Sequence, residues 1–326
     1  MTTEQIFDSF NKLNVLIIGD VMLDSYIWGA VERISPEAPV PVVSVKKRDY
    51  RLGGAANVAL NIQSLGAKPI LCALVGEDES GKKMMDCMNN LSITLDGIVL
   101  TKSRPTTVKT RVIASHQQVV RVDEESDQPA NTEEELKLLE KITALLPKCD
   151  VVIFEDYDKG VIGENLIHKT VSLAIQKGIP TIVDPKKRNF LFYKNVSLFK
   201  PNLKELREGL KTEVDAGDQS QVAKAVDLLK EKLHAQGVMV TLSEYGVFID
   251  YQNEKIKLPA HVREISDVSG AGDTVVSIAA LCAALKLNSK TIASLSNLGG
   301  GLVCQHVGVV PINKKEFLAE ALKLDF

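Results

Sequence analysis

The sequence predicts an α/β protein with one doubly wound, mostly parallel sheet that carries helices on both faces. Short continuous runs of Val, Ile and Leu alternate along most of the chain with longer stretches of helical period. Continuous apolar runs are typical of strands that are buried on both faces, as in a parallel sheet, and a βαβ alternation covers both faces with helices. No linker, internal repeat or low-complexity tract interrupts this pattern, so we expect a single domain over residues 1–326.

The predicted strands each end in a glycine or a polar residue. They are residues 13–18, 69–75, 151–154, 181–183, 197–199 and 238–242. The predicted helices are residues 55–65, 80–89, 133–146, 163–176, 203–210, 221–236, 271–285 and 289–305. Thr132 with Glu135 predicts a capping box at the start of the third helix.

Two stretches break the alternation. Residues 25–47 hold three prolines and then a strand-like run at 40–45. Residues 106–123 alternate apolar with basic positions around a turn at 115–116, which predicts a hairpin with one apolar and one polar face. We expect the segments at about 25–47 and 98–123 to form a small β-sheet lid beside the main sheet.

Composition excludes several classes of protein. The chain has 39 basic and 42 acidic residues and a net charge of −3, so it lacks the basic surface that nucleic-acid binding requires. The longest nearly apolar stretch, residues 275–285, is shorter than the ~20 residues of a membrane span, and the N-terminus lacks a basic signal region. Five scattered cysteines without a CxxC pair indicate a cytoplasmic protein without a zinc site. The expected partner is therefore a small molecule.

Polar residues follow the predicted strands at the edge of the sheet. In open parallel sheets, ligands bind beyond the carboxyl ends of the strands. Asp and Asn also simply end strands, but their accumulation favours the rim of an active site. These residues are Asp20, Asp24, Asp156, Asp184, Lys186, Asn202 and Ser243.

The strongest local signal is the sequence Asp-Val-Ser-Gly-Ala-Gly-Asp-Thr at 267–274, which opens an apolar helix. Gly270, Ala271 and Gly272 leave backbone N–H groups at the helix N-terminus open to an anion. Asp273, in the first turn, can accept a hydroxyl proton as that oxygen attacks phosphorus. The alternative is that a preceding Asp or Ser caps the helix and that the carboxylate only complements the helix dipole.

Two further motifs open helices. Gly53 and Gly54 permit a close backbone approach, and Asn57 can hydrogen-bond a polyol; a plain helix start is the alternative. Asn202 and Glu205 are either a capping arrangement or a pair that organises Mg²⁺ and its waters.

Three basic residues, Lys109, Arg111 and Arg121, share one face of the predicted hairpin. They are candidates to grip a phosphorylated substrate. A solvated strand face is the alternative interpretation.

Together these motifs resemble the ribokinase-like (PfkB) carbohydrate kinases over essentially the whole chain. The two glycine signatures of that family match residues 53–57 and 270–273, and its NxxE motif matches residues 202–205. Further stretches are similar to the branch that phosphorylates D-glycero-β-D-manno-heptose 7-phosphate. They are residues 19–24, 33–43, 53–59, 117–123, 156–160 and 267–275.

The resemblance implies an ATP-dependent kinase that phosphorylates the anomeric hydroxyl of heptose 7-phosphate to the 1,7-bisphosphate, for ADP-heptose and lipopolysaccharide core synthesis. It also implies Mg²⁺ and a homodimer formed through the lid, and it leaves a monovalent-cation requirement open. These residues contain no HxGH nucleotidyltransferase signature, so we expect the adenylyl-transfer half of the bifunctional members to be absent. The alternatives are a PfkB-type kinase of another sugar, sugar phosphate or nucleoside, and a non-catalytic sugar or nucleotide sensor.

The resemblance also assigns roles to residues of this chain. The catalytic base falls on Asp273, and the anion hole on Gly270, Ala271 and Gly272. Substrate contacts fall on Asp20, Asp24, Gly53, Gly54 and Asn57, with Lys109 and Arg111 from the lid, and we add Asp156. Nucleotide contacts fall on Asn202 and Glu205, to which we add Lys186, Ser243 and Gly246; Glu205 is also the candidate to hold the metal through water.

Overall fold

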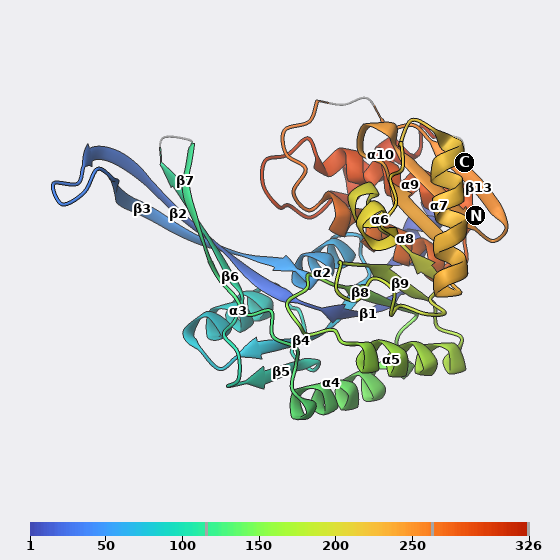
Figure 1. Ribbon diagram of the computed structural model, residues 1–326, viewed down its shortest axis with the longest axis horizontal. Helices are drawn as coiled ribbons and strands as arrows, with labels where there is room; N and C mark the ends of the chain where they lie inside the picture. Colours follow the sequence, from blue (N-terminus) through green and yellow to red (C-terminus); the bar gives the residue numbers. More distant parts are fainter. Residues whose placement is uncertain (115–116, 262–263, 325–326) are drawn as a thin grey trace.

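The computed structural model describes residues 1–114, 117–261 and 264–324, and most of them surround one large sheet (Figure 1). Its strands are β1 (Asn14–Gly19), β4 (Lys68–Gly76), β5 (Ile98–Thr101), β8 (Val151–Glu155), β9 (Thr181–Asp184), β10 (Leu198–Phe199), β11 (Val238–Thr241), β12 (Val247–Tyr251) and β13 (Glu254–Leu258). The order across the sheet is β13-β12-β11-β10-β9-β8-β1-β4-β5. Neighbours from β11 to β5 are parallel, and β12 and β13 add an antiparallel edge.

Helices cover both faces of this sheet. They are α1 (Thr3–Phe10), α2 (Ala55–Ser64), α3 (Glu79–Asn90), α4 (Thr132–Leu145), α5 (Glu164–Lys177), α6 (Leu203–Leu210), α7 (Gln219–Leu233), α8 (Ala271–Ala284), α9 (Ser289–Val303) and α10 (Lys314–Ala321). No helix among the described residues is long and apolar enough to span a membrane.

Two apolar cores lie on opposite faces of the sheet, because successive side chains of a strand point to opposite sides. In β1, Val15 and Ile17 enter one core and Leu16 and Ile18 the other. The first core packs against α1, α2, α3, α8, α9 and α10, and the second against α4, α5, α6 and α7. The doubly wound fold class is thereby confirmed.

A second sheet extends away from the main body (Figure 1). Its strands are β2 (Val21–Ile34), β3 (Pro41–Gly54), β6 (Val108–Ala114) and β7 (Gln117–Glu124), in the order β3-β2-β6-β7. β2 is antiparallel to β3 and parallel to β6, and β6 is antiparallel to β7. The small second sheet is therefore confirmed, while the turn predicted at 115–116 lies outside the described residues.

Two details of the predicted elements are wrong. Strand β5 was expected in the lid segment, but its apolar residues pair with β4 at the edge of the main sheet. The capping box of α4 joins Asn131 with Glu134 instead of Thr132 with Glu135. Asn131 has the extended backbone of an N-cap residue, and Thr132 is already helical.

Candidate active site

The carboxyl ends of the central parallel strands meet at one edge of the main sheet, and α8 begins there. Glu155 ends β8 and Asp184 ends β9. Asp20 follows β1, and Lys200 follows β10. The expected rim of polar residues therefore exists.

Asp273 lies in the first turn of α8 and is only 6% exposed. Its Oδ2 accepts a hydrogen bond from Nδ2 of Asn57 at 2.6 Å, and its Oδ1 accepts one from the hydroxyl of Tyr157 at 2.9 Å. Burial raises the pKa of Asp273, and these two hydrogen bonds partly oppose the rise. The carboxylate is fixed in orientation and is more basic than an exposed aspartate, as a proton acceptor should be.

The N-terminus of α8 is open to an anion. Its N-cap is Gly270, with φ 79°, and none of the described side chains caps the helix. Asp267, a candidate cap, instead accepts hydrogen bonds from the backbone N–H groups of Ser269 and Gly308. The first N–H groups of a helix have no partner within it; here that of Ala271 donates to the carbonyl of Val268, outside the helix, at 3.3 Å. Asp267 therefore does not cap α8 in the structure, and the anion hole at residues 270–272 stays a prediction.

The start of α2 faces the same site. Gly54 has φ 59°, and a Cβ there would lie 2.4 Å from the carbonyl oxygen of Asp20, so only glycine fits. Asn57, three residues on, is 1% exposed, and its Oδ1 has no hydrogen-bond partner among the described residues. A buried acceptor without a partner is costly. A hydroxyl of a bound sugar would satisfy it.

Asp24 and Gly53 lie together on the paired strands β2 and β3. A Cβ at Gly53 would lie 2.6 Å from Oδ2 of Asp24, so glycine leaves room for that carboxylate. Asp24 is buried and paired with the guanidinium of Arg111. The predicted substrate residues Asp24, Gly53 and Arg111 are therefore brought together.

A buried charge cluster lies beneath Gly272. Asp184 and Lys200 form an ion pair at 2.9 Å. A Cβ at Gly272 would lie 3.5 Å from Oδ2 of Asp184 and 3.9 Å from Nζ of Lys200. Burial, with the charges of Asp184 and Asp273, raises the pKa of Glu155 well above its ordinary value. Glu155, Lys200 and Tyr157 were not singled out from the sequence as site residues.

Asn202 and Glu205 form the predicted capping box at the start of α6, with the backbone N–H of Asn202 2.8 Å from Oε2 of Glu205. Oε1 of Glu205 accepts from Nζ of Lys186 at 2.6 Å. Nζ of Lys186 also lies 5.3 Å from the ring centre of Tyr157. Although burial opposes it, the charges of Asp184 and Glu205 raise the pKa of Lys186. The ammonium group of Lys186 therefore stays charged. It lies between Glu205, a predicted nucleotide contact, and Tyr157, which donates to the predicted base Asp273.

Ser243 and Gly246 belong to the turn that joins β11 to β12. The backbone N–H of Gly246 donates to the carbonyl of Ser243 at 3.0 Å, and Gly246 has φ 86°. A Cβ at Gly246 would lie 2.0 Å from the carbonyl oxygen of Leu258. The positive φ and the close approach of the Leu258 carbonyl explain why residue 246 is a glycine. A contact of Ser243 or Gly246 with the nucleotide stays a prediction.

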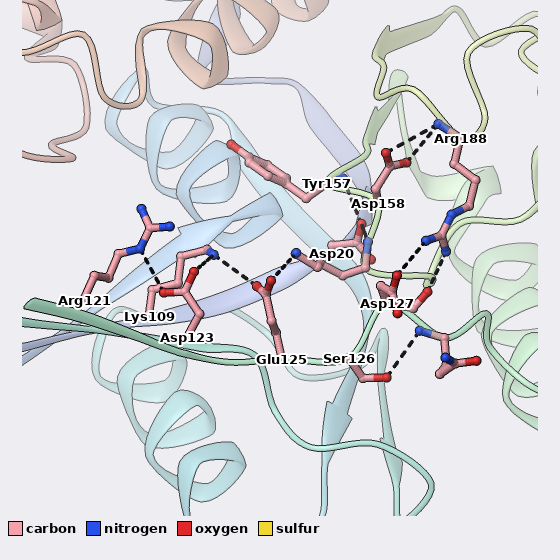
Figure 2. A network of polar contacts seen from close by, with 12 residues as sticks. Asp20, Lys109, Arg121, Asp123, Glu125, Ser126, Asp127, Tyr157, Asp158 and Arg188 are labelled. Carbon is pink, nitrogen blue, oxygen red and sulfur yellow. Dashed lines mark hydrogen bonds and ion pairs between the residues drawn. The ribbon is translucent and has the colours of Figure 1, made fainter.

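Two of the predicted substrate contacts, Asp20 and Asp156, are buried and already hydrogen-bonded within the protein, and their contact with a substrate stays a prediction. Asp20 is 1% exposed, and its carboxylate accepts a hydrogen bond from the backbone N–H of Tyr157 at 2.8 Å (Figure 2). It also accepts from the backbone N–H groups of Lys159 and Val161, both at 3.1 Å. Asp156 is fully buried, and burial raises its pKa to about 6. Both carboxylates stand at strand ends, after β1 and β8, and both accept backbone N–H groups of the loop that follows β8.

Asp156 accepts hydrogen bonds from Nδ2 of Asn189 at 2.9 Å and from the hydroxyl of Tyr193 at 2.8 Å. Its nearest polar neighbours are therefore interior side chains. These contacts fix the carboxylate of Asp156 within the core.

An ion-pair network joins the root of the hairpin to the main body (Figure 2). Nζ of Lys109 lies 3.1 Å from both Asp123 and Glu125, and Nζ of Lys159 lies 2.7 Å from Glu125. Arg121 pairs with Asp123 at 2.9 Å. Lys109, Arg111 and Arg121 are thus all neutralised by carboxylates, so a substrate phosphate would have to compete with these carboxylates.

The sequence profile of the pfkB family carbohydrate kinases matches residues 12–316. The chain belongs to this family. It is therefore a carbohydrate kinase, an enzyme that transfers a phosphoryl group to a sugar hydroxyl and that uses ATP and a divalent metal. The motif resemblance to PfkB kinases is confirmed.

Curated relatives of this carbohydrate kinase bear the name Bifunctional protein HldE. One from Syntrophotalea carbinolica is 38% identical over 324 residues, 98% of this chain and 65% of its own length. One from Helicobacter pylori strain HPAG1 is 40% identical over 294 residues, 90% of this chain and 63% of its own length. The chain thus spans somewhat less than two thirds of these relatives.

Solved structures of other kinases share the fold. Phosphofructokinase-2 from Escherichia coli has a TM-score of 0.75 at 18% identity, over 94% of this chain and 99% of its own. A ribokinase from Arabidopsis thaliana, complexed with ribose and ATP, has a TM-score of 0.72 at 17% identity, over 96% and 99% of the two chains. At this identity the likeness extends to the ribokinase-like fold, second sheet included, and no further.

Proposed function

We propose that this kinase transfers the γ-phosphoryl group of ATP to the anomeric hydroxyl of D-glycero-β-D-manno-heptose 7-phosphate. The product would be the 1,7-bisphosphate, a precursor for ADP-heptose and the lipopolysaccharide core. The observation that carries the kinase chemistry is the placement of Asp273 beside the open N-terminus of α8. The choice of heptose rests on the branch motifs in the sequence and on relatives that are 38–40% identical over most of this chain.

In this proposal Asp273 accepts the proton of the attacking hydroxyl. Each of its oxygens already accepts one hydrogen bond, from Asn57 or Tyr157, and each keeps a second lone pair for the substrate. The free Oδ1 of Asn57 accepts a neighbouring sugar hydroxyl. The backbone N–H groups of residues 270–272 stabilise the negative charge that develops on the transferred phosphoryl group.

The residues present fit a magnesium ion that is held mainly by phosphate oxygens and water. The described residues contain no cluster of three or more potential ligands from His, Cys, Asp and Glu. Both oxygens of Glu205 already accept hydrogen bonds, so Glu205 would hold Mg²⁺ through water. When bound, Mg²⁺ neutralises charge on the phosphate oxygens. Assays in potassium and in tetramethylammonium salts decide whether a monovalent cation is also required.

We further propose that the second sheet acts as a lid and pairs two copies of the chain. Large apolar side chains of this sheet are 48–61% exposed, which is unusual for a protruding sheet that stays alone in water. They are Ile34, Val45, Val120 and Val122, together with Val40 in the loop between β2 and β3. All five cysteines are free thiols, which agrees with the cytoplasmic location that we propose.

The test is ADP release from Mg·ATP with a panel of acceptors: heptose 7-phosphate, fructose 6-phosphate, ribose, fructose and adenosine. A strong preference for heptose 7-phosphate is the expected result. Preference for an unphosphorylated sugar would leave the kinase activity standing. It would refute heptose 7-phosphate as the substrate and the proposed phosphate contacts of Lys109 and Arg111. Ligand binding without ADP release from any acceptor would favour a sensor.

A further inference from the structure

Tyr157 occupies a position that the kinase chemistry described so far does not use. Its hydroxyl donates to Oδ1 of Asp273 at 2.9 Å, while its backbone N–H donates to Asp20 at 2.8 Å. In Figure 2 the ring points away from Asp20, so the residue bridges from the end of β1 to the start of α8. We propose that Tyr157 is a positioning residue that orients the carboxylate of Asp273 and keeps it ionised for proton transfer.

The hydroxyl of Tyr157 is well suited to this role. Burial raises the pKa of Tyr157 well above its ordinary value, and the charge of Asp273 raises it further. The phenol therefore remains a hydrogen-bond donor at every pH at which the enzyme works. A donor that stays protonated stabilises the ionised carboxylate relative to the neutral acid. Asn57 donates to the other oxygen, so the two donors together fix the plane of the carboxylate.

Without this hydroxyl, the pKa of Asp273 would rise further, because one of the two hydrogen bonds that oppose the effect of burial would be lost. Burial and the nearby carboxylate of Asp184 raise its pKa. Lys200 opposes them, but it is already paired with Asp184. Asn57 is the remaining donor, and it is uncharged.

The test exploits the fact that Tyr157→Phe removes the hydroxyl and keeps the ring. The aromatic face beside the ammonium of Lys186 is retained, so that contact survives. Loss of a hydrogen bond to a buried charge corresponds to a rise of about one unit in the pKa of the acceptor. We expect the acidic limb of the pH profile of kcat/KM for the sugar to move up by about one pH unit, with activity largely recovered at alkaline pH.

Tyr193→Phe is the matched control, because Tyr193 is also buried and also donates to a buried aspartate, Asp156, at 2.8 Å. It should leave the acidic limb in place. Difluorotyrosine at position 157, a stronger donor with the same shape, should move the limb in the opposite direction, to lower pH. This second variant keeps the test decisive if Tyr157→Phe does not fold.

The inference rests on the proposed role of Asp273, and the two can fail separately. Near-normal turnover of Asp273→Asn would remove the proposed base itself. Loss of turnover in Asp273→Asn, together with an unmoved acidic limb in both Tyr157 variants, would overturn the positioning role alone. A uniform loss of kcat at every pH in Tyr157→Phe would likewise overturn it, because that result indicates only a structural contribution.

Discussion

Replacement of Asp273 by asparagine is the most direct test of the site, because the structure shows how the variant would be accommodated. The asparagine oxygen can accept from Nδ2 of Asn57, and its amide can donate to the hydroxyl oxygen of Tyr157. Both present contacts are therefore preserved in a side chain of the same shape. What is lost is the ability to accept a proton.

The expected loss in kcat for Asp273→Asn is about 10²–10⁴-fold, the usual contribution of a general base. This corresponds to about 2.7–5.4 kcal/mol in the activation free energy. The assay is ADP release at saturating Mg·ATP and sugar, with calorimetric ATP binding as the control for folding and the nucleotide site. A kcat within tenfold of the unmodified enzyme, with ATP binding intact, would refute the argument that Asp273 takes the proton.

Three further changes test other parts of the structure. Gly270→Ala places a Cβ 3.2 Å from Nδ2 of Asn57 at a φ of 79° and should lower kcat at least tenfold. The control Gly178→Ala has a similar φ of 67° but open space around it, so it should cost only about 1 kcal/mol of stability. Equal turnover in the two variants would contradict the anion hole. Burial raises the pKa of Asp156 to about 6, so between about pH 4 and 6 the folded protein keeps a proton that the unfolded chain has released. The free energy of unfolding therefore falls in this window by up to about 1.4 kcal/mol for each unit that pH rises. Urea titrations of Asp156→Asn should show a flatter dependence on pH over this window, and an unchanged slope would exclude this titration. Val120→Asp should convert the proposed dimer to a monomer in light scattering, whereas Leu136→Asp on α4 should not. A dimer in both variants would place the interface outside the second sheet.

The sequence was sufficient to predict the parts of the fold whose signals are local. The buried strands β1, β4 and β8 are continuous apolar runs, and α8 follows a glycine motif, so periodicity and turn chemistry identify each of them. The antiparallel pair β12 and β13 was not predicted. Strand β13 is mostly polar, and its pairing depends on the Gly246 turn and on packing against α9, which is separated from it in sequence.

The sequence predicts site residues where a motif suggests the chemistry, as at residues 270–273. It could not predict them where the role of a residue depends on tertiary contacts. Asp20 and Asp24 look equivalent in the sequence, yet Asp20 binds three backbone N–H groups of a neighbouring loop and Asp24 pairs with Arg111. Tyr157 was not predicted as a site residue, because its proposed role depends on a hydrogen bond to Asp273, which lies 116 positions away in the sequence.

The long strand β3 makes the second sheet a mechanical lever. It runs for 14 residues from the solvent-exposed end at Pro41 to Gly54, the N-cap of α2. At about 3.3 Å per residue this ribbon is roughly 45 Å long. Because its inner end continues directly into the helix that carries Asn57, a tilt of about 5° at the root displaces the far end by about 4 Å. A load applied at that distant tip therefore acts as a torque on the start of α2, which carries Asn57, the residue that we propose binds the sugar.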